Sequence, residues 1–378
     1  MSFLLGALRR DPLHSASSRR RRRTRRTKVH TVSPHRHRLS LEPLEERTML
    51  STFGVLNTTD SGAGSLRQAI LDTNANPGAD IIDFNIADSD AGHVYFRDDG
   101  IAGSLSLVAT TTLSDGAIAD FDPDYPSTPH SWFSIQPLSA LPAITDPVII
   151  DGYTQPGSSP NTLANGNDAV LRIELNGTAA SGANGLEITA DGSTVQGLVI
   201  NGFGGTGVAI TGDNNVLAGN LIGTDMTGTL ALGNGSVGVA INGQSNRIGT
   251  NGDGVSDEIE RNVISANGTG MKVEGSFNVI AFNSGAGVRI AGASATANRI
   301  QRNSIHSNGD LGIDLDWDGV TANDLGDADV GPNNLQNFPI VAFATTDGGS
   351  TEIAGSLNSI PNATFQLDLY SSERPWRR

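Results

Sequence analysis

A short pattern, Gly-apolar-x-apolar, recurs along the second half of the chain and limits the folds open to it. Its six occurrences begin at Gly185, Gly207, Gly238, Gly270, Gly287 and Gly312. The intervals between them are 22, 31, 32, 17 and 25 residues. A unit this short cannot bury its own apolar face, so successive units must stack on one another.

The repeated units have the composition of strands and tight turns. The chain contains 46 glycines and only 5% aromatic residues, and β-branched residues suit a pleated sheet while glycine accepts turn conformations. An Asn-x-Ile pattern alternates with the tetrads, at Asn246, Asn262, Asn278, Asn298 and Asn303. We therefore predict an all-β chain whose residues 146–335 form a right-handed parallel β-helix, with inward apolar columns and a corner ladder of asparagines.

The remaining parts of the chain are predicted from local signals. Residues 51–95 read as an N-terminal cap, in which Ser65 begins an amphipathic helix, Pro77-Gly78 ends it and a strand follows. Residues 96–145 carry no repeat and form either an inserted lobe or the first coils. Residues 336–378 read as the start of a β-sandwich-like module, cut short, with two antiparallel strands around 358–362.

Charge divides the chain sharply. Residues 1–50 hold 13 of the 25 basic and 4 of the 40 acidic residues, so the rest carries a net charge of about −24. This balance argues against a nucleic-acid partner, and residues 1–50 read as a disordered basic segment. The chain has no cysteine, which excludes disulfides and thiolate chemistry, and no apolar run long enough for a transmembrane segment.

Several motifs resemble known bacterial sequences. The basic arm ends in LEPLEERTMLS (41–51), which is similar to the N-terminal sorting segment of large extracellular proteins from planctomycete bacteria. SLRQAI (65–70) resembles the SLREAI element that opens many bacterial right-handed β-helix surface proteins, with Gly64 where that family often has cysteine. LPAITDPVIIDGYTQPG and GNLIGTDMTGTLALGN resemble a β-helix family of the pectin-lyase-like superfamily. These resemblances imply an extracellular or cell-surface location.

An acidic segment near the end of the repeats is a candidate calcium site. Between Asp314 and Gly331 lie six aspartates, Asp314, Asp316, Asp318, Asp324, Asp327 and Asp329. No Lys or Arg occurs from Asn303 to Glu373, so no local partner neutralises them. The spacing begins like a D-x-D-x-D-G calcium loop, but Leu325 stands where an EF-hand needs glutamate. Bound Ca²⁺ and a solvated acidic turn both remain open, with a catalytic cluster as a third alternative.

The middle residues of the six tetrads are predicted to stack as one exposed column, about 4.8 Å apart. They are Glu187, Ala209, Ala240, Lys272, Arg289 and Asp314. Polysaccharide lyases with this fold use a basic residue to abstract a sugar proton, a role open to Lys272 or Arg289. Two solvated charges on a sheet face are the alternative. His93, His130 and His306 are widely separated and are interpreted as structural.

The function predicted from these features is a non-catalytic secreted or cell-surface protein, adhesin-like or a matrix scaffold, that binds carbohydrate and calcium. The rival hypothesis is a polysaccharide lyase or glycoside hydrolase acting on acidic polysaccharide. Insertions after Ile222 and after Ile248 are candidate binding loops, because solenoids extrude extra residues at their corners. The oligomeric state does not follow from the sequence.

Overall fold

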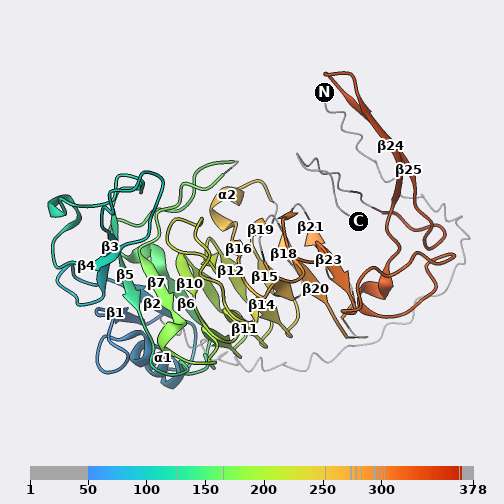
Figure 1. Ribbon diagram of the computed structural model, residues 1–378. Coiled ribbons are helices and arrows are strands. Elements are labelled where there is room, and N and C mark those ends of the chain that lie inside the picture. Colours follow the sequence, from blue (N-terminus) through green and yellow to red (C-terminus); the bar gives the residue numbers. More distant parts are fainter. Residues whose placement is uncertain are drawn as a thin grey trace, which may run out of the picture. The chain divides into compact units, whose positions relative to one another are not determined.

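A computed structural model describes most of the chain after residue 49 (Figure 1). The described residues are 50–125, 127–164, 166–251, 253–272, 275–276, 279–281, 283–292, 295–296, 298, 300–301, 303–365 and 367. The predicted disordered basic segment therefore lies outside them, apart from residue 50.

Three large sheets dominate the described chain, and nearly all of their strand pairs are parallel. The first contains β1 (Thr52–Val55), β2 (Asp80–Phe84), β6 (Val148–Asp151), β9 (Thr194–Gln196), β12 (Val216–Ala218) and β15 (Arg247–Ile248). The second contains β3 (His93–Phe96), β4 (Val108–Thr110), β5 (Ser131–Ile135), β7 (Ile173–Asn176), β10 (Leu198–Asn201), β13 (Leu221–Ile222), β16 (Val263–Ser265), β19 (Val279–Ala281) and β22 (Ser304–His306). The third contains β8 (Leu186–Ile188), β11 (Val208–Ile210), β14 (Val237–Ile241), β17 (Thr269–Lys272), β20 (Val288–Ile290) and β23 (Ile313–Leu315).

The chain passes through the three sheets in a fixed order. Strands β9, β10 and β11 belong to the first, second and third sheets, and β12, β13 and β14 repeat that order one coil later. The pair β18 (Gly275–Ser276) and β21 (Ile300–Gln301) forms a small parallel sheet of its own. Each Gly-apolar-x-apolar tetrad thus contributes a strand of the third sheet, and the chain is an all-β structure with parallel sheets, as predicted.

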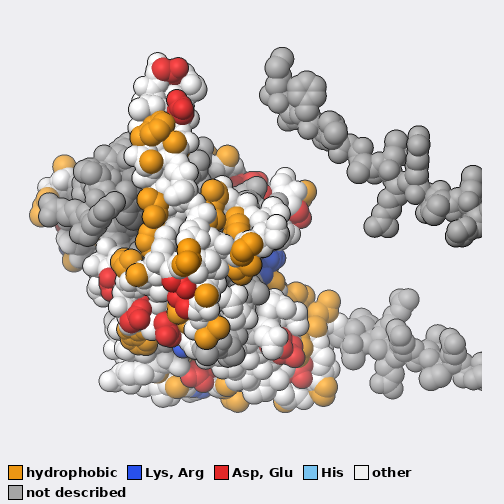
Figure 2. Space-filling model, turned by 90° about the vertical axis from the view of Figure 1, so that its right-hand side faces the viewer, with side chains coloured by type: hydrophobic (Ala, Val, Ile, Leu, Met, Phe, Trp, Pro, Cys, Tyr) orange, Lys and Arg blue, Asp and Glu red, His pale blue; other side chains and the backbone are white. Residues whose placement is uncertain are grey.

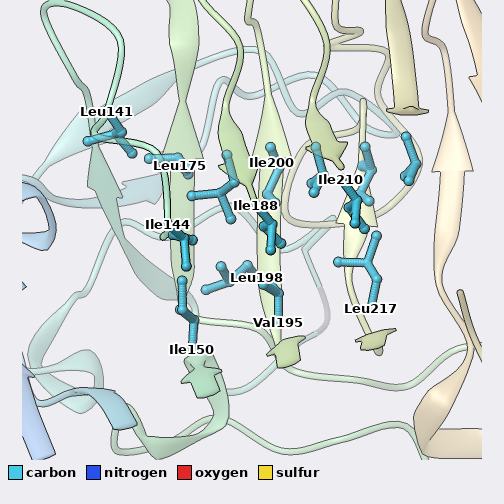
Figure 3. Close-up of a cluster of buried hydrophobic side chains, with 14 of the residues drawn as sticks. Leu141, Ile144, Ile150, Leu175, Ile188, Val195, Leu198, Ile200, Ile210 and Leu217 are labelled. Atoms are coloured by element: carbon cyan, nitrogen blue, oxygen red, sulfur yellow. The ribbon is translucent and has the colours of Figure 1, made fainter. Parts of the chain in front are cut away.

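Buried aliphatic side chains from the three sheets meet in one interior cluster (Figure 3). In the first sheet Ile150 pairs with Val195, and Val195 pairs with Leu217, so their side chains form a column. In the second sheet Leu175 pairs with Ile200. Every one of these side chains is almost completely buried, and burying one such side chain stabilises the fold by roughly 1.5–3 kcal/mol. The predicted inward columns are confirmed.

Asparagine ladders join the corners of successive coils, as predicted. The backbone N–H of Asn220 donates to Oδ1 of Asn262 over 3.0 Å. A second ladder, which the Asn-x-Ile pattern did not mark, runs through Asn234, Asn267, Asn283 and Asn308. The side-chain amides of Asn234, Asn267 and Asn283 donate hydrogen bonds to buried carbonyls of the turns. The ladder therefore has a structural role and not a ligand-binding one, because it satisfies polar groups of the backbone. Asn278 lies outside the described residues.

The helices in the described residues are few and short. The longest is α1 (Leu66–Ala75), which begins as predicted at Ser65, whose side chain accepts a hydrogen bond from the N–H of Gln68. The others are α2 (Asp257–Glu260) and the 3₁₀ turns η1 (Asp115–Ala117), η2 (Gly152–Thr154), η3 (Gly177–Ala179) and η4 (Pro332–Leu335). Helix α1 packs against β1 and β2. None of the helices in the described part of the chain has the length and apolarity needed to cross a bilayer.

Residues 96–130 form a lobe at the end of the second sheet, near β3 and β4 in Figure 1. Strand β3 is antiparallel to both β4 and β5, whereas β5 is parallel to β7. Eight buried side chains make a second apolar cluster here, namely Val94, Phe96, Tyr125, Trp132, Leu171, Val199, Leu221 and Met226. Met226 comes from the insertion after Ile222. That insertion was predicted to be a candidate binding loop. Its residues 224–226 are buried, whereas residues 229–232 are exposed.

An antiparallel hairpin, β24 (Ile340–Thr346) and β25 (Thr351–Ser356), follows the third sheet. Residues 351–356 thus pair with the preceding strand. Most of the strand predicted after residue 362 lies outside the described residues. The turn is made by residues 347–350, where Oδ1 of Asp347 accepts the N–H of Ser350 over 2.8 Å. Figure 2 shows hydrophobic side chains along this hairpin, and Ile340, Val341 and Phe343 are about half exposed.

Candidate functional site

The predicted column on the third sheet exists in the predicted register. Glu187 pairs with Ala209 and Ala209 with Ala240, and the column continues through Lys272 and Arg289 to the last coil. Arg289 then pairs with Asp314. Lys272, Arg289 and Asp314 are therefore neighbours on consecutive coils, although Asp314 lies 42 positions after Lys272 in the sequence.

The end of this column is not the exposed row of charges that was predicted. Asp314 is buried, and its Oδ2 lies 3.9 Å from Nε of Arg289. Only 11% of the Arg289 side chain is exposed, because the Trp317 ring covers its guanidinium at 3.6 Å from the ring centroid. Asp316 and Trp317 adopt positive φ angles of 67° and 65°, which turn the chain back over the arginine. Asp314 therefore has a counter-charge, supplied by the preceding coil.

The Arg289–Asp314 contact is electrostatic and leaves polar atoms without hydrogen bonds. Nε of Arg289 and Oδ1 of Asp314 are both buried and have no hydrogen-bond partner. Burial raises the pKa of Asp314, while a backbone hydrogen bond from Gly319 and the charge of Arg289 act against that rise. An arginine held between a carboxylate and an indole keeps its proton, so this geometry does not suit Arg289 to abstract a proton from a substrate.

Lys272 is the other sequence-predicted base. Its side chain is half-buried, and its neighbours along the column are Ala240 and Arg289. No carboxylate among the described residues lies within ion-pair distance of it. On one side of Lys272 the column continues through the small side chains of Ala240 and Ala209, which offer little surface against which a sugar could be held.

Three of the six predicted metal ligands come together beyond the last coil. Asp324, Asp327 and Asp329 each contribute one carboxylate oxygen to a group whose members all lie within 4.8 Å of one another. Calcium binds oxygens at 2.3–2.6 Å, so two oxygens on opposite sides of one ion are separated by about twice that distance, or roughly 5 Å. The spacing of the three carboxylates therefore fits one calcium ion. The other three aspartates do not join the group, since Asp314 faces Arg289 and Asp316 and Asp318 are exposed.

Asn337 holds the acidic group in place, a role that the sequence did not reveal. Its backbone N–H donates to Oδ1 of Asp327 over 2.8 Å, and its side-chain amide donates to the carbonyl of Asp324 over 2.8 Å. The N–H of Asp324 in turn donates to Oδ1 of Asn337. Oδ1 of Asp329 is buried without a hydrogen-bond partner. The loop is thus fixed by neutral donors, and one carboxylate oxygen remains unsatisfied.

An open groove of about 460 Å³ lies beside the lobe. Asp88, Asp115, Gln155 and Arg172 contribute polar groups to its lining, and Pro129 contributes an apolar face. The Arg172 guanidinium is fixed by the carbonyls of Ser131 and Pro156 and lies 5.1 Å from the centroid of the Phe133 ring. Carboxylates and a fixed guanidinium are groups that hydrogen-bond sugar hydroxyls.

The histidines occupy separate places. His93 is buried and stacked on Phe133 with ring centroids 4.6 Å apart, and burial lowers its pKa. His130 is stacked on Phe121 at 3.7 Å, and His306 is exposed. His93 and His130 are thus engaged by aromatic rings, which agrees with the structural interpretation for those two.

No protein-family model matches this sequence, and a search of the curated proteins found no match either.

Proposed function

We propose that this chain is a non-catalytic scaffold, adhesin-like or part of a matrix, in a secreted or cell-surface protein. Its coils would form a right-handed parallel β-helix with α1 as the cap at the N-terminal end. The hand follows from the strong preference for right-handed connections between parallel strands. Packing of α1 against the first two strands supports the cap, since an open sheet edge invites unwanted pairing.

The observation that carries the non-catalytic proposal is the engagement of Arg289 by Asp314 and Trp317. A lyase on this fold needs a free base facing an open cleft, and here one of the two candidate bases is covered. The test is incubation of the purified chain with polyuronates, followed by ultraviolet absorbance of the unsaturated sugar. We expect no absorbance rise. A rise that Lys272→Ala abolishes would replace this proposal with a polysaccharide lyase.

The second part of the proposal is a calcium ion held at the junction by Asp324, Asp327 and Asp329. These three converging carboxylates have no ion-pair partner among the residues that the structure describes. They repel one another, and a bound cation removes that repulsion. Because a ligand that binds only the folded state raises its stability, millimolar Ca²⁺ should raise the melting temperature. Asp329→Asn should reduce the rise. Asp318→Asn, an exposed aspartate of the same segment, is the matched control and should leave the rise unchanged.

We propose that carbohydrate binds in the open groove of about 460 Å³ beside the lobe. The expected ligand is a neutral or calcium-bridged polysaccharide, because a body with a net charge of about −24 repels free polyanions. Retention of the chain on immobilised polysaccharides is the measurement. Asp88→Asn should weaken retention and Asp318→Asn should not; equal retention of all three proteins would exclude the groove.

A further inference from the structure

Three carboxylates in the lobe converge in a way that the sequence did not suggest. Asp98, Asp99 and Asp122 each contribute an oxygen to a group whose members all lie within 4.8 Å of one another. Two antiparallel segments bring them together. The N–H of Asp98 donates to the carbonyl of Asp120 over 2.9 Å, and the N–H of Asp122 donates to the carbonyl of Phe96 over 2.8 Å. The backbone therefore fixes the approach of residues that are more than 20 positions apart.

An unsatisfied buried oxygen within this group points to a ligand. Asp122 is 1% exposed, and its Oδ2 is buried without a hydrogen-bond partner. Its other oxygen, Oδ1, accepts only the N–H of Asp124 over 2.9 Å. A buried carboxylate oxygen that lacks a donor costs free energy, and two further carboxylates beside it increase that cost. A cation within the group would satisfy the oxygen and neutralise its neighbours together.

The two other members accept hydrogen bonds that fix their orientation. Oδ2 of Asp99 accepts the hydroxyls of Ser104 and Ser106 over 2.8 and 2.6 Å, and its Oδ1 accepts the N–H of Ile101. These hydrogen bonds lower the pKa of Asp99. Oδ1 of Asp98 accepts the N–H of Gly100 over 2.7 Å. The loop thus places its carboxylates by hydrogen bonds from neutral donors.

We propose that Asp98, Asp99 and Asp122 form a second calcium site, which ties the loop after β3 to the segment 119–125. All three donors are hard oxygens, with neither histidine nor cysteine among them, which favours Ca²⁺ or Mg²⁺ over transition metals. Calcium suits the site better, because it accepts irregular coordination and bidentate carboxylates, whereas Mg²⁺ requires a near-ideal octahedron. One side of the group is open to solvent, since Asp98 is exposed, so water can complete the shell.

This site is independent of the one at the junction, and the experiment separates them. The full chain is titrated with CaCl₂ by isothermal calorimetry, as the native protein and as the variants Asp122→Asn, Asp98→Asn, Asp329→Asn and Glu352→Gln. We expect Asp122→Asn and Asp98→Asn each to remove one equivalent of bound calcium or to weaken it at least about tenfold. Glu352→Gln, an exposed carboxylate on β25, is the matched control and should change nothing.

Hydrogen–deuterium exchange locates the effect. Calcium should slow exchange of amides in 97–107 and 119–125 in the native chain and in Asp329→Asn, but not in Asp122→Asn. Failure of the junction site alone would leave this protection intact. The proposal would be overturned if calcium did not change the exchange rates of 97–107 and 119–125 and if Asp122→Asn and Asp98→Asn bound as much calcium as the native chain.

Melting temperatures in EDTA and in calcium give a second measurement, which compares each variant with the native chain in the same solution. In EDTA, Asp122→Asn should melt at or above the temperature of the native chain, because a neutral amide replaces a buried carboxyl group that has one oxygen without a hydrogen-bond partner. In about 5 mM Ca²⁺, in the range that loads weak extracellular sites, the order should reverse. The same order in both solutions would show a buried carboxylate with no metal role.

Discussion

At the scale of single residues, the last turn of the third sheet shows how a carboxylate can be buried in an acidic chain. Asp314 has no basic residue near it in sequence, yet the coil before it places Arg289 directly alongside. Trp317 then covers the guanidinium. The pair is thus removed from water on one side by the indole and on the other by the sheet, which makes its energetics depend on pH.

Replacing the arginine tests this pairing. Arg289→Met should destabilise the fold by up to about 3 kcal/mol at neutral pH, because it leaves a buried carboxylate without a counter-charge. The folded-state pKa of Asp314 is already raised by burial and should rise further in the variant. The folded state of the variant therefore loses stability as pH rises from the pKa of Asp314 in the unfolded chain toward its raised pKa in the folded chain. The stability difference between the variant and the native chain should shrink as pH falls. Chemical denaturation between acidic and neutral pH measures it.

A matched control comes from the exposed ion pair of Arg97 and Asp120. Its closest atoms are 3.8 Å apart, and both side chains are more than half exposed. Arg97→Met should cost less than about 1 kcal/mol, as is usual for a surface pair. If Arg289→Met cost no more than this control at neutral pH, the buried pair would contribute nothing to stability.

At the scale of elements, the corners between strands are the most tightly constrained positions. Gly212 follows β11, and a Cβ atom there would lie 1.9 Å from the carbonyl oxygen of Ala190 on the neighbouring coil. The glycine is therefore required by close stacking of one coil on the next. By contrast, a Cβ atom on Gly116 would meet nothing within 4 Å.

Alanine substitutions at these two glycines should have opposite effects. Gly212→Ala should destabilise the chain by about 1–3 kcal/mol, because the backbone must shift to relieve the overlap. Gly116→Ala should be neutral or slightly stabilising, by up to about 1 kcal/mol, since it restricts the unfolded chain without a clash. Equilibrium unfolding of both variants is the measurement. Equal effects would mean that coil stacking tolerates a methyl group.

The asparagine ladder supplies a second test at this scale. The side-chain amide of Asn267 donates to the carbonyls of Ile222 and Ser265, and its oxygen accepts the N–H of Asn234. Asn267→Ala should cost about 3 kcal/mol, since several buried polar groups lose their partners together. Asn242→Ala, at an exposed position, should change the free energy of unfolding by less than about 0.5 kcal/mol. A similar small effect at Asn267 would contradict the ladder's structural role.

Local patterns predicted the elements better than the contacts between distant segments. The tetrads predicted the third sheet and its register down to the pairing of Lys272 with Arg289, because a stacked repeat leaves little freedom. The burial of Asp314 depends on positive φ angles at Asp316 and Trp317 in the following turn. The identities of these two residues do not predict that conformation. The group of Asp98, Asp99 and Asp122 depends on pairing between segments without a repeat. Neither the burial of Asp314 nor this group of aspartates could be predicted from the spacing of residues in the sequence.

At the scale of the whole molecule, each coil is stabilised mainly by its two neighbours, so stability is close to a sum over coils. Ser193 and Asn215 hold equivalent places one coil apart, and the N–H of Ser193 donates to Oδ1 of Asn215 over 2.7 Å. The residues that follow are also equivalent, since Val195 pairs with Leu217. A coil is therefore a unit that can be removed without changing the order of the sheets.

Deleting one coil tests this modularity. Removal of residues 193–214 joins Gly192 to Asn215 and should keep the β-sheet circular dichroism and a cooperative melt, at a lower temperature because one layer of core is lost. Removal of only 193–203 is the matched control. It should abolish cooperative melting, since strands of the second and third sheets would no longer meet their partners. Loss of folding in both deletions would contradict the additive picture.

The junction after the last coil has a further consequence, for proteolysis. Its loop exposes Asp316, Trp317 and Asp318 to solvent, and exposed loop tips are where proteases usually cut a folded chain. Yet enzymes that cleave after lysine or arginine find no such residue from Asn303 to Glu373. Trypsin-like proteases therefore have no cleavage site in this exposed turn, whereas proteases that recognise acidic, aromatic or aliphatic side chains do.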